Sequence, residues 1–149
     1  MSVHNLPNGQ PALEFITLDE LREAQDRIRP FINRTPIIRN DYFSKRLSEL
    51  VGHDICVQFK CESFQPTGSF KLRGAANGVL KAINNSTAIQ GVATSSSGNH
   101  GAAVAHIAKK VNLNSAIVVS EDISETKLEN IADCGGEIIK IQPNNISSL

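Results

Sequence analysis

The sequence of 149 residues contains no tryptophan, a single tyrosine and three cysteines, and its 15 Lys and Arg side chains are balanced by 15 Asp and Glu side chains. The cysteines, Cys56, Cys61 and Cys134, are odd in number and form no C-x-x-C pair, which argues against a disulfide framework and against a zinc site. A balanced charge lacks the basic surface that nucleic-acid binding requires. We therefore expect no metal site and no nucleic-acid partner.

Long apolar runs are also missing. The longest strongly apolar run, residues 116–119, is far shorter than the roughly 20 residues that a membrane-spanning helix needs. The first thirty residues lack the basic start and the apolar stretch of a signal peptide. With 40% hydrophobic and 20% charged residues, the composition is that of a folded globular protein. We expect a cytoplasmic protein that does not contact a membrane.

Two helices are predicted in the first third of the chain. A capping box formed by Thr17 and Glu20 begins the first helix, and Pro30 closes it. Apolar residues at positions 43, 47 and 50 indicate a second helix, which ends at Gly52. Residues 1–16 have little periodicity and are expected to form a loose N-terminal arm.

From residue 54 onward, short β-rich runs alternate with helical stretches. The predicted strands are residues 54–60, 91–94, 115–119 and 137–141, and the predicted helices are residues 69–83, 99–111 and 124–134. Single helices between successive strands imply parallel pairing. The sequence therefore predicts an α/β fold, a four-stranded parallel sheet with flanking helices over residues 53–149, preceded by a helical segment at 17–52.

Lys71 is the first candidate for chemistry. It lies in the first turn of a predicted helix, after the loop that follows the first predicted strand. There the helix dipole opposes a positive charge and favours the neutral amine, which can form a Schiff base with a carbonyl. A solvated surface lysine is the alternative reading of this residue, and it stays open.

A second loop, residues 94–101, carries three serines and two glycines at the start of another helix. Hydroxyl and amide donors at a helix N-terminus can bind an anion, and glycine permits close approach of the backbone. An ordinary turn with a serine as N-cap is the alternative. Because both loops follow strands of a parallel sheet, we expect them to converge at one rim of that sheet.

Taken together, residues 69–75 (SFKLRGA) and 96–101 (SSGNHG) resemble the fold type II pyridoxal-phosphate enzymes. Within that superfamily they are most similar to the serine/threonine dehydratase and serine racemase group. The resemblance runs from about Thr17 to Pro143 and includes residues 34–36 (RTP). It implies a lyase of amino-acid metabolism, with isomerase activity left open, that acts on serine or threonine.

The resemblance also implies roles for individual residues. Lys71 would hold pyridoxal 5'-phosphate as a Schiff base and act as the base on one face, with Phe70 against the cofactor ring and Asn99 hydrogen-bonded to the ring hydroxyl. Ser97 matches the position that in serine racemases is the acid and base on the opposite face. The substrate would be bound by residues of the second loop, namely Ser96, Ser97, Asn99 and His100.

Enzymes of this group are much longer than this chain, which resembles their N-terminal half. Residues 17–52 would belong to an incomplete large domain, and the phosphate cradle is expected outside this chain. Three interpretations follow: a truncated dehydratase that is inactive alone, a non-catalytic ligand-binding or interaction module, and one half of a two-chain enzyme. Because the predicted helices expose apolar faces, we expect self-association or a partner chain that covers residues 17–52.

Overall fold

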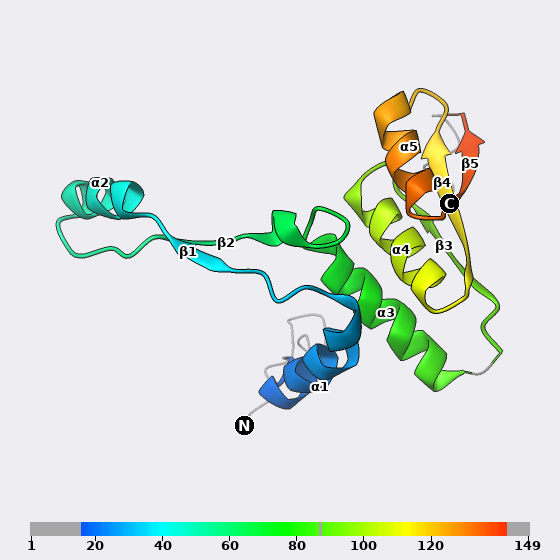
Figure 1. Ribbon diagram of the computed structural model, residues 1–149, viewed down its shortest axis with the longest axis horizontal. Coiled ribbons are helices and arrows are strands. Elements are labelled where there is room, and N and C mark those ends of the chain that lie inside the picture. Colours follow the sequence, from blue (N-terminus) through cyan, green and yellow to red (C-terminus); the bar gives the residue numbers. More distant parts are fainter. Residues whose placement is uncertain (1–15, 87, 143–149) are drawn as a thin grey trace, which may run out of the picture.

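The computed structural model describes residues 16–86 and 88–142 (Figure 1). The predicted arm at residues 1–16 lies, apart from Ile16, outside these residues. The helices are α1 (Leu18–Ile28), η1 (Arg29–Phe31), α2 (Asp41–Val51), η2 (Glu62–Phe64), α3 (Lys71–Asn85), α4 (Asn99–Lys110) and α5 (Glu125–Asp133). The strands are β1 (Ile37–Arg39), β2 (Gln58–Lys60), β3 (Gly91–Ser95), β4 (Asn114–Ser120) and β5 (Glu137–Ile141).

The first two helices begin and end at the residues that local rules select. The Thr17 hydroxyl accepts a hydrogen bond from the Glu20 amide at 3.2 Å, and the Glu20 carboxylate accepts one from the Thr17 amide at 2.7 Å. This confirms the predicted capping box. Helix α2 ends at Gly52, whose φ of 76° is the left-handed conformation of a C-cap.

Residues 37–60 project away from the rest of the molecule and consist of β1, α2 and β2 (Figure 1). We call this segment, which is distinct from the predicted N-terminal arm at residues 1–16, the arm. Strands β1 and β2 form a two-stranded antiparallel ribbon in which Ile38 lies opposite Phe59. The prediction that residues 54–60 form the first strand of the parallel sheet is therefore wrong. The last three residues of this segment form β2, which pairs antiparallel with β1, and all three are exposed, whereas strands of a parallel sheet are covered on both faces.

The parallel sheet has three strands in the order β3-β4-β5 instead of the predicted four. The α/β class, the parallel pairing and the flanking helices are as predicted. Helices α4 and α5 contact each other and the sheet, so both cover the same face (Figure 1). Ile117 and Val119 of β4 point into this layer and are almost fully buried.

The core also joins α3 to α4. Leu72 and Ala76 of α3 and Ala102 and Ala105 of α4 are fully buried, and the small alanine side chains let the two helices approach closely. Helix α1 packs on the other side of α3 through Ile28. Among residues 16–86 and 88–142, no helix combines the length and apolar character needed to cross a membrane.

Candidate functional site

The loop between η2 and α3 leads directly to Lys71, the first residue of α3. Phe70 is the N-cap, and no side chain caps this helix end. The Lys71 side chain is exposed, and its Nζ lies 5.0 Å from the centroid of the Phe70 ring, which is itself 59% exposed. The amine is therefore accessible to a carbonyl compound, and an exposed aromatic ring lies beside it.

The second loop connects β3 to α4. The Ser96 amide donates to the Val118 carbonyl at 3.0 Å and so extends the β3–β4 pairing. The N-cap of α4 is Gly98, and no side chain caps the helix. The alternative of a serine N-cap is therefore wrong. The first-turn amides of α4 are left without a side-chain partner, and such amides attract an anion.

The predicted substrate residues all lie in this bend. Ser97 and Asn99 are exposed, while Ser96 and His100 are half-buried. Gly101 fixes the bend against the sheet, because a Cβ at this position would lie 2.5 Å from the Ser96 carbonyl oxygen and 2.9 Å from Cγ2 of Ile117. No larger residue fits there without displacing the backbone of the bend.

The prediction that the two loops meet at one rim of the parallel sheet is wrong, because the loop before Lys71 follows β2 of the antiparallel ribbon. The packing of α3 on α4 brings the two loops together instead. The two helices lie side by side and run in the same direction, so that their N-terminal ends lie at one end of the pair (Figure 1). Phe70 and Lys71 therefore start one helix, and the bend at residues 96–98 starts its neighbour. Within residues 16–86 and 88–142, no hydrogen bond connects the two sets of side chains.

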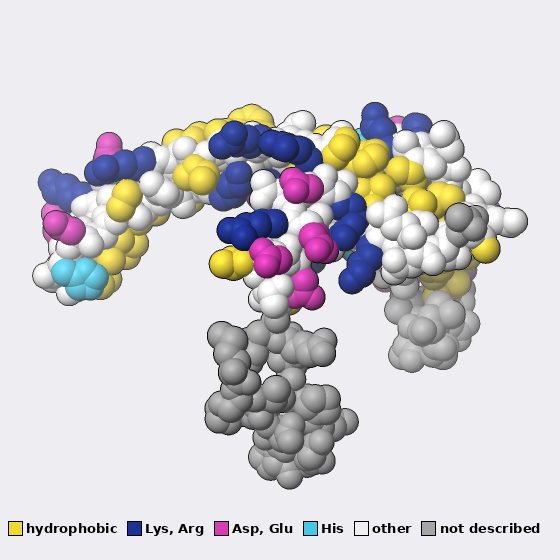
Figure 2. All heavy atoms as spheres, turned by 90° about the horizontal axis from the view of Figure 1, so that it is seen from below, with side chains coloured by type: hydrophobic (Ala, Val, Ile, Leu, Met, Phe, Trp, Pro, Cys, Tyr) yellow, Lys and Arg dark blue, Asp and Glu magenta, His cyan; other side chains and the backbone are white. Residues whose placement is uncertain are grey.

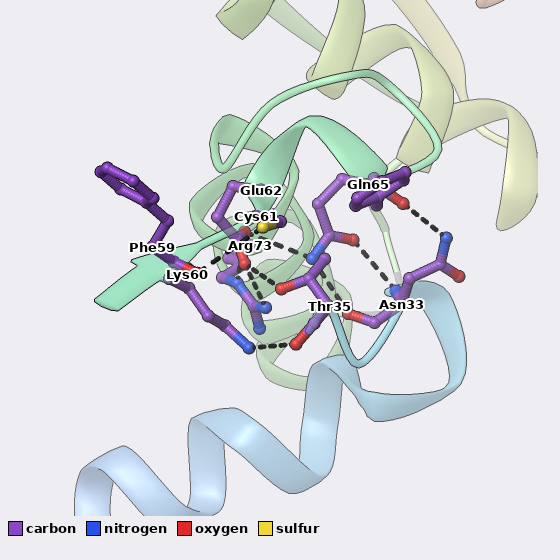
Figure 3. A network of polar contacts seen from close by, with 9 residues as sticks. Asn33, Thr35, Phe59, Lys60, Cys61, Glu62, Gln65 and Arg73 are labelled. Atoms are coloured by element: carbon purple, nitrogen blue, oxygen red, sulfur yellow. Dashed lines mark hydrogen bonds and ion pairs between the residues drawn. The ribbon is translucent and has the colours of Figure 1, made fainter. Parts of the chain in front are cut away.

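Sequence reasoning missed Glu62, which organises the loop before Lys71. Its carboxylate accepts two hydrogen bonds from Arg73, from Nε and Nη2, both at 2.8 Å, and one from the Thr35 hydroxyl at 2.6 Å (Figure 3). These hydrogen bonds, that of Arg73 first, lower the pKa of Glu62 from 4.5 to about 2 against the opposing effect of burial. Glu62 gives no sequence signal, because its partners are 11 and 27 residues away.

A surface depression of about 700 Å³ lies on the arm, between α2 and residues 54–56. Two serines in its wall, Ser44 and Ser48, already accept hydrogen bonds from the amides of Val57 and Ile55, at 2.9 and 2.8 Å. Neither Lys71 nor the bend lines this depression. The hydroxyls of Ser44 and Ser48 therefore connect α2 to residues 55–57 and already have hydrogen-bond partners.

Comparison with known proteins gives a coherent result. The family described as pyridoxal-phosphate dependent enzyme matches residues 28–148. A serine racemase of Oryza sativa subsp. indica is 40% identical over 122 residues, which are 82% of this chain and 34% of the relative. A β-hydroxyaspartate dehydratase of Paracoccus denitrificans is 37% identical over 131 residues, which are 88% of this chain and 39% of the relative.

Solved structures agree with these matches. The crystal structure of a pyridoxal 5'-phosphate-dependent aspartate racemase superposes with a TM-score of 0.80 at 34% identity and covers 89% of this chain and 40% of that one. The chain thus spans little more than a third of the length of its relatives. The resemblance inferred from the two loops and the fold class are both confirmed.

Proposed function

The chain belongs to the pyridoxal-phosphate dependent enzyme family, and from this premise we propose that it is the N-terminal portion of a serine/threonine dehydratase or serine racemase. A serine racemase and a β-hydroxyaspartate dehydratase each match it over more than four-fifths of its length. Because it spans about a third of theirs, we expect it to be inactive alone. The observation that carries the proposal is that Lys71 and the bend at 96–98 begin two packed helices at the same end.

Lys71 is proposed to hold the cofactor. Its exposed amine fits the cofactor's aldehyde, and the exposed Phe70 ring beside it fits the aromatic ring. When bound, pyridoxal phosphate withdraws electrons from the α-carbon of an amino acid, which makes the proton on that carbon acidic. The Lys71 amine would accept this proton on one face. We assign none of the described residues to the phosphate, which the portion beyond this chain would hold.

The bend before α4 is proposed to bind the substrate carboxylate. The free first-turn amides, together with Ser96, Asn99 and His100, supply donors where the helix dipole favours negative charge. Asn99 would also hydrogen-bond the ring hydroxyl of the cofactor. Ser97 is exposed, so its hydroxyl is free to exchange a proton with the α-carbon from the face opposite Lys71. Return of a proton there would give racemisation, whereas departure of the β-hydroxyl with a proton, as water, would give elimination.

A partner for the arm is part of the proposal. Hydrophobic side chains gather along the arm (Figure 2). Leu50 and Tyr42 of α2 are 80% and 73% exposed, and Ile37 of β1 is 61% exposed. This favours a second polypeptide, or a second copy of the chain, over an isolated binding module.

A cytoplasmic location remains a prediction.

The test uses the pure chain mixed with pyridoxal phosphate, reduced with borohydride and digested for peptide mapping by mass spectrometry. We expect weak labelling that is selective for Lys71 over the other lysines, and loss of that selective label in the Lys71→Ala variant. Keto-acid formation from serine should be absent. Labelling spread evenly over the lysines would refute the role of Lys71, and rapid keto-acid production by the pure chain would refute the need for a missing portion.

A further inference from the structure

We propose that Glu62 is a positioning residue, which directs the Lys71 amine toward the bend before α4 by holding Arg73 in the first turn of α3. The inference rests on the proposed function, because it assigns a role in presenting Lys71. It concerns a side chain that touches neither the cofactor nor the substrate in that proposal.

Glu62 binds the guanidinium of Arg73 in a bidentate arrangement. Nε and Nη2 of Arg73 each donate a 2.8 Å hydrogen bond to one oxygen of the Glu62 carboxylate. A guanidinium bound in this way is fixed in direction as well as in distance. Glu62 and Arg73 side chains are 17% and 33% exposed, whereas the side chains of the three other ion pairs in residues 16–86 and 88–142 are all at least 53% exposed. This pair is the one shielded from solvent.

Glu62 is itself held from the opposite side. The Thr35 hydroxyl donates to Oε1 of Glu62 at 2.6 Å, and the side-chain Nε2 of Gln65 donates to Oε2 of Glu62 at 3.3 Å. The Gln65 side chain also bridges to the backbone of Asn33, accepting from its amide and donating to its carbonyl, both at 3.0 Å (Figure 3). The carboxylate is therefore a fixed point between residues 33–35, η2 and α3.

The start of α3 needs such an anchor because it has no side-chain cap. Successive residues of a helix are separated by about 100° around its axis. Leu72 is fully buried against the core, and Arg73 is held by Glu62 on an adjoining side. Two anchors at different angles fix the rotation of the first turn, and with it the direction of Lys71 on the remaining flank.

The test compares Glu62→Gln, Glu62→Asp and wild type in the borohydride labelling, with Lys81 at the exposed end of α3 as internal reference. Glu62→Gln keeps the shape and removes the charge that holds the guanidinium. Asp41→Asn, which removes the exposed ion pair to Arg39 on the arm, is the matched control. Urea unfolding and hydrogen exchange of residues 77–85 establish that each variant is folded.

We expect Glu62→Gln to lower labelling of Lys71 relative to Lys81 by about fivefold, because a misdirected amine loses the advantage of its position. Glu62→Asp should lie between Glu62→Gln and wild type, and Asp41→Asn should match wild type. A folded Glu62→Gln variant that labels Lys71 as selectively as wild type would overturn the positioning role and leave the proposed function standing. Unselective labelling of the wild type would instead overturn the proposed function, and this role with it.

Discussion

Replacing Glu62 by Gln should make the stability of the fold depend less on pH. In the folded chain the hydrogen bonds from Arg73, Thr35 and Gln65 hold the pKa of Glu62 near 2, against 4.5 as its ordinary value. A carboxyl group with a lowered pKa contributes stability at pH values above 4.5, and this contribution is lost as the pH falls toward 2. Glutamine does not titrate, so the variant lacks this contribution at every pH.

The magnitude follows from the size of the shift. A change from 4.5 to about 2 corresponds to at most about 3.5 kcal/mol, since one pKa unit is worth about 1.4 kcal/mol. The Arg73 side chain is 33% exposed, so solvent screens part of the pair. We expect Glu62→Gln to cost roughly 1–2 kcal/mol at pH 7 and about a quarter of that near pH 2.5, because most of the contribution is lost as the pH approaches the folded-state pKa of about 2.

The assay is urea unfolding of wild type and Glu62→Gln at several pH values between 7 and 2.5, with the difference in unfolding free energy plotted against pH. Asp41→Asn serves as the control, because its carboxylate is 83% exposed and its pair with Arg39 should add little at any pH. A difference between wild type and Glu62→Gln that stays constant from pH 7 to pH 2.5 would show that the carboxylate contributes nothing through its charge, and would refute the reasoning.

Three further predictions concern packing and assembly. Gly101→Ala should destabilise the fold by about 1–3 kcal/mol, because its Cβ would meet the Ser96 carbonyl oxygen at 2.5 Å, whereas Gly78→Ala on open helix surface should be neutral or stabilising in the same urea assay. Ile117→Ala should cost about 2–5 kcal/mol, since this side chain is fully buried, and thermal unfolding that stays at the wild-type temperature would contradict its place in the core. The chain should self-associate through the arm, and Leu50→Lys should weaken that association; a clean monomer at high concentration in sedimentation would count against the prediction.

The features that the sequence predicted correctly are those decided by neighbours along the chain. The capping box at Thr17 and the C-cap at Gly52 each involve residues within one helical turn. The strands and helices from residue 91 to residue 141 follow an alternation whose period is visible locally, and β5 is found at the predicted residues 137–141. Lys71 and the bend before α4 are found at helix starts, as their short local motifs indicate, whereas the roles assigned to these residues stay predictions.

The features that could not be predicted depend on distant partners. Residues 58–60 pair with β1 and not with the parallel sheet, and their partners lie 19 to 23 residues earlier in the chain. The hydrogen bonds of Glu62 to Thr35 and Arg73 join segments that no spacing rule connects. Nothing in the residues around Glu62 distinguishes it from the other carboxylates of the chain.

The arm and the core differ in how they are stabilised. No residue of the arm, 37–60, belongs to the hydrophobic cluster that unites α1, α3, α4, β4 and α5, so the helices that carry Lys71 and the bend are packed without it. The root of the arm is nevertheless tied to α3, because Lys60 donates to the Thr35 carbonyl at 2.7 Å and the Thr35 hydroxyl donates to Glu62. A partner that binds the arm and shifts its root would act on the anchor of the Lys71 turn, whereas the bend before α4, fixed by Gly101 against β4, would stay in place.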